Sequence, residues 1–162
     1  MRAVGLVVLA GCWGEAAIDI SGTYHVASIV ESACADDVPV AGIAYLDIYS
    51  APGGYAVDGC ADAAAMSCAR FTLLDDPIDD EGWGSTQATA VINGDLATCD
   101  LTFSVLTALL SDTTLSIEHT IYIDTIDSGS PACTDAEARK RGDAMACNKH
   151  QVLVATQLTI QP

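Results

Sequence analysis

Positive charge is the scarcest property of this sequence. The chain has 6 Lys and Arg residues against 22 Asp and Glu residues, which gives a formal net charge of −16 at pH 7. This balance excludes nucleic-acid binding, because recognition of the phosphate backbone depends on Lys and Arg side chains. An anionic membrane surface would repel the domain for the same reason.

Long apolar runs and the common motifs of catalysis are also missing. No stretch approaches the roughly 20 apolar residues of a transmembrane helix, although 51% of the chain is hydrophobic. The sequence contains no G-x-S-x-G turn, no phosphate-binding P-loop and no H-E-x-x-H zinc motif. We therefore expect one folded domain that is not an enzyme.

The first twelve residues have the features of an export signal. Arg2 supplies a positive charge, and residues 3–9 form an apolar run too short to span a bilayer. Leu9-Ala10-Gly11-Cys12 then resembles the lipobox of bacterial lipoproteins. This resemblance implies cleavage before Cys12, acylation of its thiol and new amino group, and membrane attachment through the lipid. The alternatives are an ordinary secretory signal and a buried strand with a stray cysteine.

The lipobox divides the chain into three parts. It implies a signal peptide over residues 1–11, a lipidated tether over residues 12–17 and a single β domain over residues 18–162. The resemblance also places the protein in the cell envelope. Trp13 follows the cysteine where lipoproteins retained at the inner membrane often carry aspartate, so the outer membrane is favoured over the inner one.

Six cysteines remain if Cys12 carries lipid. An even number of cysteines in an exported chain predicts three disulfides. Proximity in sequence favours Cys60–Cys68 and Cys133–Cys147, which leaves Cys34–Cys99 by elimination. A zinc site is disfavoured because no C-x2-C spacing occurs.

Eight segments have the patterns of β-strands. They are residues 18–30, 43–49, 55–60, 70–74, 83–92, 100–105, 114–124 and 150–160. Alternation is clearest where Leu101, Phe103 and Val105 share one face, and in the last segment Val152, Val154, Leu158 and Ile160 share one face. Asn93-Gly94 is a strong signal for a hairpin turn.

One short helix is predicted before the last strand. Thr134 and Glu137 form a capping box, in which each side chain accepts a hydrogen bond from a free amide of the other residue. The last turn carries three consecutive bases, Arg139, Lys140 and Arg141, before Gly142 ends the helix. Because cations complement the helix dipole there, we interpret these bases as helix-end chemistry in preference to a binding patch.

These elements predict an all-β fold: an antiparallel meander barrel of about eight strands, with a two-sheet β-sandwich as the alternative. Ser21-Gly22-Thr23-Tyr24 resembles the glycine-x-aromatic opening of lipocalins, which implies the same kind of barrel. The region after Cys12 also resembles small cysteine-rich bacterial lipoproteins of unknown function. That likeness rests on the G-T-Y strand, on Cys99-Asp100-Leu101 and on the helix flanked by cysteines.

His119 interrupts the apolar face of the segment 114–124. In a barrel that holds a ligand, it is a candidate for the polar group that orients the guest, with Tyr24 and Tyr45 as further candidates. The alternative is a core histidine whose hydrogen bonds are satisfied within the protein, or one at the barrel mouth.

Five carboxylates crowd the segment 75–81 and could bind calcium, which prefers oxygen ligands. They are Asp75, Asp76, Asp79, Asp80 and Glu81. Their spacing does not match an EF-hand loop, and a solvated acidic loop is the alternative.

Two functions follow as hypotheses. The first is a lipid-anchored, non-enzymatic binding module for a small apolar ligand. The second is an envelope structural or interaction protein whose acidic surface meets partners or calcium. No other cofactor is indicated.

Overall fold

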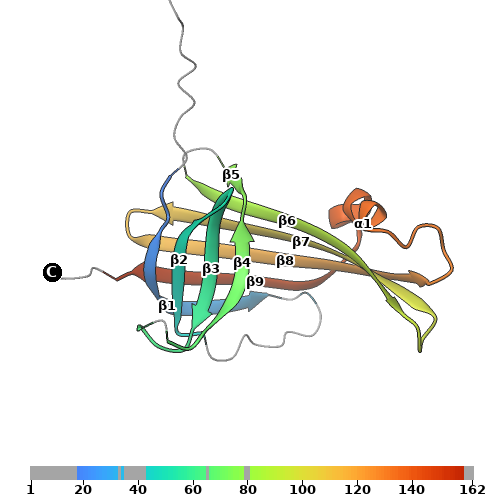
Figure 1. The fold of residues 1–162 in the computed structure, drawn as a ribbon, viewed down its shortest axis with the longest axis horizontal. Coiled ribbons are helices and arrows are strands. Elements are labelled where there is room, and N and C mark those ends of the chain that lie inside the picture. Colours follow the sequence, from blue (N-terminus) through green and yellow to red (C-terminus); the bar gives the residue numbers. More distant parts are fainter. Residues whose placement is uncertain (1–17, 33, 35–42, 65, 79–80, 159–162) are drawn as a thin grey trace, which may run out of the picture.

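The computed structural model describes residues 18–32, 34, 43–64, 66–78 and 81–158 (Figure 1). The predicted signal peptide and tether lie outside these ranges, with Cys12 and the calcium candidates Asp79 and Asp80.

Nine strands and one α-helix make up the described chain, which confirms an all-β fold with a short helix before the last strand. The first four strands are β1 (Gly22–Ser32), β2 (Tyr45–Ala51), β3 (Gly54–Cys60) and β4 (Cys68–Leu74). They are followed by β5 (Asp76–Ile78), β6 (Gly82–Asn93), β7 (Thr98–Ser111) and β8 (Thr114–Asp127). The helix α1 (Asp135–Arg141) and a 3-10 turn η1 (Gly142–Ala144) then lead into β9 (Ala146–Gln157). The ninth strand, unforeseen from the sequence, is the three-residue β5.

All strands belong to one antiparallel sheet in the order β4-β3-β2-β1-β9-β8-β7-β6-β5. The sheet curls into a nearly closed barrel, so the sandwich alternative is wrong. Strands β4 and β5 lie at its two edges although they follow each other in the chain. Asp75 connects them, and its amide donates to the carbonyl of Gly84 in β6 (3.0 Å). The barrel therefore has a seam between β4 and β6, joined at the end where Asp75 lies.

Three residues before β1 are tied into the barrel by aromatic side chains from three strands. The donors are Tyr24 to the Ile20 carbonyl (2.9 Å), Tyr55 to the Asp19 carboxylate (2.9 Å) and the Trp83 indole to the Ile18 carbonyl (2.8 Å). Each ring packs against apolar neighbours and donates through its polar tip, as buried Tyr and Trp usually do. We call residues 18–20 the plug.

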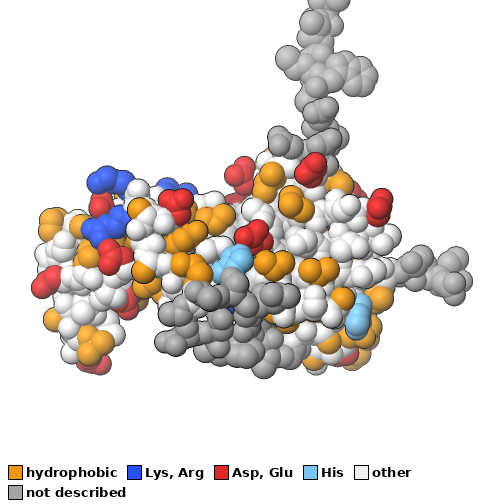
Figure 2. Space-filling model, turned by 180° about the vertical axis from the view of Figure 1, so that it is seen from behind, with side chains coloured by type: hydrophobic (Ala, Val, Ile, Leu, Met, Phe, Trp, Pro, Cys, Tyr) orange, Lys and Arg blue, Asp and Glu red, His pale blue; other side chains and the backbone are white. Residues whose placement is uncertain are grey.

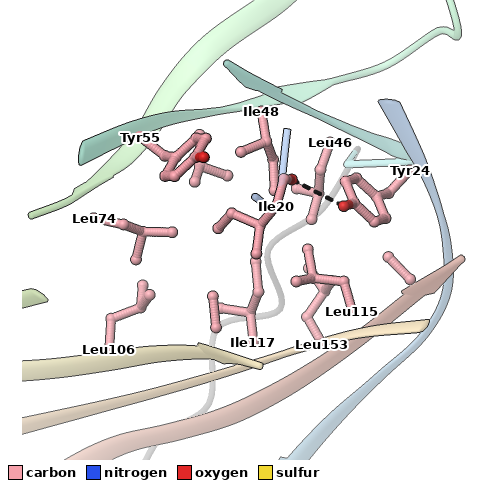
Figure 3. Close-up of a cluster of buried hydrophobic side chains, with 13 residues drawn as sticks. Ile20, Tyr24, Leu46, Ile48, Tyr55, Leu74, Leu106, Leu115, Ile117 and Leu153 are labelled. Carbon is pink, nitrogen blue, oxygen red and sulfur yellow. Dashed lines mark hydrogen bonds between the residues drawn. The ribbon is translucent and has the colours of Figure 1, made fainter. Parts of the chain in front are cut away.

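The main core packs around the plug (Figure 3). Side chains from seven strands point toward Ile20, which is fully buried. The largest fully buried side chains of this cluster are Tyr24, Leu46, Ile48, Leu74, Leu115 and Ile117. This half of the barrel interior is therefore filled by the protein's own side chains.

A second, smaller core lies outside the barrel, where β6, β7 and β8 run past it and α1 covers them (Figure 1). Buried Cys99, Leu101, Ala138 and Met145 form it, and Phe103 packs against them. The predicted face of Leu101, Phe103 and Val105 therefore points away from the barrel interior, which β7 fills with Leu106 and Ala108 instead. The sequence pattern showed an apolar face correctly, but the helix decides which side of the sheet that face takes.

The predicted face of the last strand also needs correction. β9 buries Gln151, Leu153 and Ala155 inside the barrel, whereas Val152 and Val154 are only half-buried. Alternate residues of a strand point to opposite faces, and both faces of β9 are partly apolar, so hydropathy alone favoured the wrong one.

All six described cysteines are paired, but in two cases with other partners than predicted. Cys60–Cys68 is present as expected, whereas Cys34 bonds Cys147 and Cys99 bonds Cys133. The antiparallel pairing of β1 with β9 brings the end of one strand to the start of the other, which aligns Cys34 with Cys147. The loop before α1 returns to β7, where Cys133 meets Cys99. Tertiary register, not distance in sequence, selects these partners.

Three disulfides indicate an oxidising compartment outside the cytoplasm. Within the described ranges, no helix has the length and the hydropathy that crossing a bilayer requires.

Candidate functional site

A pocket of about 260 Å³ opens on the barrel seam, beyond the filled core. We call it the seam pocket. Side chains of β4, β6, β7 and β8 line it: Phe71, Thr72, Ser85, Gln87, Ser104, Leu106, His119 and Ile121. The pocket exists because β4 and β6 are not paired there, so their side chains face each other across a gap that no strand fills.

His119 is the central polar group of the seam pocket. Its Nε2 shares a hydrogen bond with the Ser104 hydroxyl (2.8 Å), and Phe71 presents its ring edge-on, with the ring centroids 6.1 Å apart. Burial, and then the charge of Lys149, lowers the pKa of His119 below its ordinary value of 6.5. The imidazole is therefore neutral at neutral pH, with one nitrogen able to donate and the other able to accept.

Gln151 lies directly opposite His119 in the pairing of β8 with β9. Paired residues share a face of the sheet, so the two side chains belong to the same part of the interior. Gln151 is only 3% exposed, and its Nε2 has no hydrogen-bond partner among the described residues. Buried amide groups nearly always have a partner, so this donor is an exception, and it lies beside His119 although Gln151 itself does not line the pocket.

The other two predicted ligand-binding residues do not join His119. Tyr24 is fully buried in the main core, where it donates to the plug. Tyr45 pairs with His25, with the two rings edge-on at 5.2 Å. Neither tyrosine lines the seam pocket.

Sequence reasoning missed the pocket's other polar groups. Ser104 and Gln87 sit directly opposite each other on β7 and β6, and both are polar residues on a face that is apolar nearer the plug. Gln151 is a polar residue on the buried face of β9. This pattern would have identified it in the sequence if the correct face of β9 had been predicted.

A second hollow, of about 590 Å³, lies on the outer face of β7 and β8 beside the C-terminal turn of α1. We call it the helix groove. Three cross-strand pairs, Phe103 with Tyr122, Val105 with Thr120 and Thr107 with Glu118, line it. Residues 139–143 line it from the helix side.

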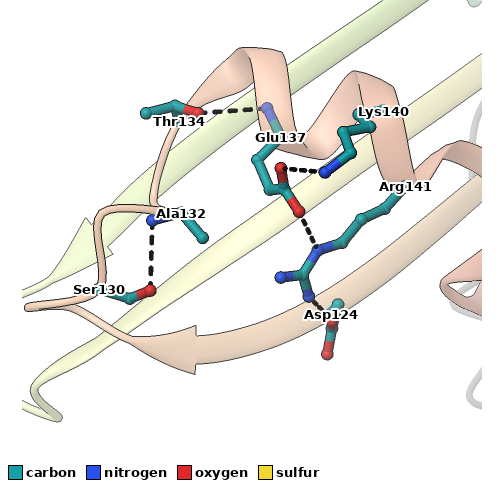
Figure 4. A network of polar contacts seen from close by, with 7 residues as sticks. All are labelled: Asp124, Ser130, Ala132, Thr134, Glu137, Lys140 and Arg141. Carbon is teal, nitrogen blue, oxygen red and sulfur yellow. Dashed lines mark hydrogen bonds and ion pairs between the residues drawn. The ribbon is translucent and has the colours of Figure 1, made fainter.

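Charged side chains around α1 form a network (Figure 4). Glu137 accepts from Arg141 (3.1 Å) and Lys140 (3.3 Å), and these two bonds hold the pKa of Glu137 below its ordinary value. Arg141 also reaches the Asp124 carboxylate on β8. Thr134 caps the helix by accepting from the Glu137 amide (3.1 Å), but the Glu137 side chain does not return the bond. The predicted capping box is therefore only half formed: the Thr134 amide donates to the Ala132 carbonyl instead (2.9 Å), and the Glu137 carboxylate binds the two cations.

The structure leaves the calcium prediction untested. The described candidates Asp75, Asp76 and Glu81 are exposed, and the other two lie outside the described ranges. Within the described part of the chain, no group of three or more His, Cys, Asp or Glu side chains is arranged to hold a metal ion.

Comparison of this chain with protein-family models, with curated proteins and with solved structures finds no match. Its fold and the chemistry of its two hollows are therefore the basis for any inference about function.

Proposed function

We propose that this protein is an extracytoplasmic, non-enzymatic binding module that holds one small, largely apolar ligand in the seam pocket. The observation that carries the proposal is the pairing of the neutral His119 with the unpartnered amide of Gln151 beside a partly apolar pocket. Ligand sites of this kind combine apolar walls with a few convergent polar groups that set orientation.

The size of the seam pocket limits the ligand. Its 260 Å³ is just below the range of roughly 300–1,000 Å³ that is typical of ligand sites. A cavity of about 150 Å³ can hold benzene. The ligand is therefore about the size of a substituted aromatic ring, with one hydroxyl or carbonyl group for His119.

Phenol and p-cresol are suitable probes, with toluene as the matched compound without a hydroxyl. We expect both phenols to bind and to shift the imidazole resonances of His119 in NMR spectra, and toluene to bind more weakly. Ser104→Leu removes the hydroxyl beside His119 and fills part of the pocket, so it abolishes phenol binding. The control is Thr102→Leu, which makes a similar change two residues along the same face of β7. Phenol binding that survives Ser104→Leu, or that leaves His119 unshifted, would refute the seam pocket as the site.

The lipid anchor is the second part of the proposal, and it rests on Leu9-Ala10-Gly11-Cys12. Two or more acyl chains on Cys12 would hold the domain at the membrane, since a single chain gives only marginal binding. Mass spectrometry of the protein from a bacterial host should find a chain that begins at an acylated Cys12. Cys12→Ser should leave the protein unacylated. A wild-type chain that retains Met1 would contradict the proposal.

A further inference from the structure

The helix groove combines an apolar floor with a basic rim. Phe103 and Tyr122 face each other across the strand pair, with ring centroids 6.2 Å apart, and Val105 extends the floor. Arg139, Lys140 and Arg141 form the wall on the helix side. At about 590 Å³, the groove lies well within the usual volume range of ligand sites, roughly 300–1,000 Å³.

The groove lies where the protein concentrates its few cations. Only 6 Lys and Arg residues occur in a chain of net charge −16, and three of them line this groove. Figure 2 shows Lys and Arg side chains gathered at one end of the molecule, with hydrophobic and acidic side chains directly beside them. This groove is therefore where an anionic group meets cationic side chains on an otherwise acidic protein.

The three bases are not equally engaged within the protein. Arg141 is held by Glu137 and Asp124, and Lys140 by Glu137, with 76% of the Lys140 side chain exposed. Arg139 is exposed and makes no ion pair within the described residues. The ion pairs at the helix end therefore leave the guanidinium of Arg139 and the exposed part of the Lys140 ammonium group able to bind an external anion.

The opposite wall sets a limit on the ligand. Glu118 lies there and is bonded to His150 (2.8 Å), and Asp143 lies at the groove beside the helix end. A ligand with several negative charges would meet these carboxylates. One anionic head at the Arg139 side, followed by an apolar body over the floor, avoids them.

We infer that the helix groove binds a monomeric amphiphile with a single anionic head group, such as an alkyl carboxylate. Arg139 and Lys140 bind the head, and Phe103, Val105 and Tyr122 contact the apolar body. This site is separate from the seam pocket, because β7 and β8 present Ser104 and His119 on the inner face and the groove residues on the outer face.

Decanoate below its critical micelle concentration is the probe, and decanol and decylamine are the matched neutral and cationic compounds. Calorimetric titration should show that decanoate binds at least tenfold more tightly than either of them. In NMR spectra, decanoate should shift the amides of Val105, Tyr122 and Arg139 and leave the His119 ring unshifted. Shifts at His119 instead would assign the binding to the seam pocket and overturn the inference.

Two variants and a control test the roles of charge and floor. Arg139→Gln should weaken decanoate binding about tenfold, as expected for loss of a charge-assisted hydrogen bond, and leave decanol unchanged. Thr120→Glu puts a carboxylate in the floor and should abolish decanoate binding. Arg70→Gln removes the same charge from β4, outside the groove, and should change neither ligand.

Two further results would overturn the inference. One is decanoate binding that is unaffected by Arg139→Gln. The other is sedimentation of the protein with phosphatidylglycerol vesicles in the absence of any binding to monomeric decanoate, which would assign the basic rim to a membrane surface.

Discussion

Removing the hydroxyl of Tyr24 is the most direct test of how the plug is held inside the barrel. The side chain is fully buried, and its hydroxyl donates to the carbonyl of Ile20, a plug residue that is itself fully buried. Tyr24→Phe keeps the ring and removes only the donor. The loss combines a net hydrogen-bond contribution of roughly 0.5–1.5 kcal/mol with the cost of a carbonyl left unsatisfied. We expect the free energy of unfolding to fall by about 2 kcal/mol and Tm by roughly 4–8 °C.

The same substitution should change the response to alkaline pH. Burial first, and then the charges of Asp19 and Tyr55, raises the pKa of Tyr24 from 10.0 to about 12. Between these two values the folded protein binds more protons than the unfolded chain, so its stability falls as pH rises. At about 1.4 kcal/mol for each pKa unit, the loss approaches 3 kcal/mol. The difference in free energy of unfolding between the wild type and Tyr24→Phe should therefore disappear by about pH 12.

Urea denaturation followed by circular dichroism, with the disulfides intact, measures both effects. Tyr49→Phe is the control, because it removes the hydroxyl of an exposed tyrosine, and it should stay within about 0.5 kcal/mol of the wild type. If Tyr24→Phe is as stable as the wild type at neutral pH and shows the same alkaline dependence, the plug is not held by this hydrogen bond.

Three further predictions concern the disulfides and the polar part of the interior. Replacing Cys34 and Cys147 by alanines opens a loop of 113 residues and should lower the free energy of unfolding by about 5 kcal/mol. The same change at Cys99 and Cys133 opens a loop of 34 residues and should lower it by about 4 kcal/mol. Equal losses in urea denaturation would contradict the explanation by loop-closure entropy. Gln151→Met removes a buried donor that has no partner among the described residues, so calorimetry should show stability raised by about 1 kcal/mol, whereas a clear loss would mean that the amide is bonded. Burial, and then the charge of Lys149, lowers the pKa of His119 in the folded protein. Between that lowered pKa and 6.5 the unfolded chain binds more protons, so stability falls as pH drops from 6.5 through the folded pKa. His119→Gln should make that acid dependence shallower in urea titrations, and an unchanged slope would refute the shift.

Strand patterning predicted the fold class because alternation is a local property. The segments around Leu115 and Ile117 have one apolar and one polar face, and a register slip by one residue would expose the apolar one. The turn at Asn93-Gly94 and the helix stop at Gly142 were equally visible, since each depends on the conformational range of a few residues. His119 was found for the same reason, as a polar residue on an apolar face.

Choices between partners far apart in the chain could not be predicted. Sequence proximity suggested a Cys133–Cys147 disulfide, but the pairing of β1 with β9 brings Cys147 next to Cys34, and these two form the disulfide. Leu101 and Phe103 do form an apolar face as predicted, but this face packs against α1 on the outside of the barrel. Gln151 and Ser104 join His119 only through the register between β7, β8 and β9.

The sequence by itself determined that this chain forms antiparallel strands, that it carries an acidic surface and that its cysteines come in an even set after Cys12. Those properties depend on residue type and on spacing within a few positions. Only the tertiary structure decided which face of each strand is inside, which cysteines meet, and where two hollows open. The physical reason is that these features depend on how the sheet closes. Closure brings residues from distant strands into contact and decides which of their side chains fill the barrel interior.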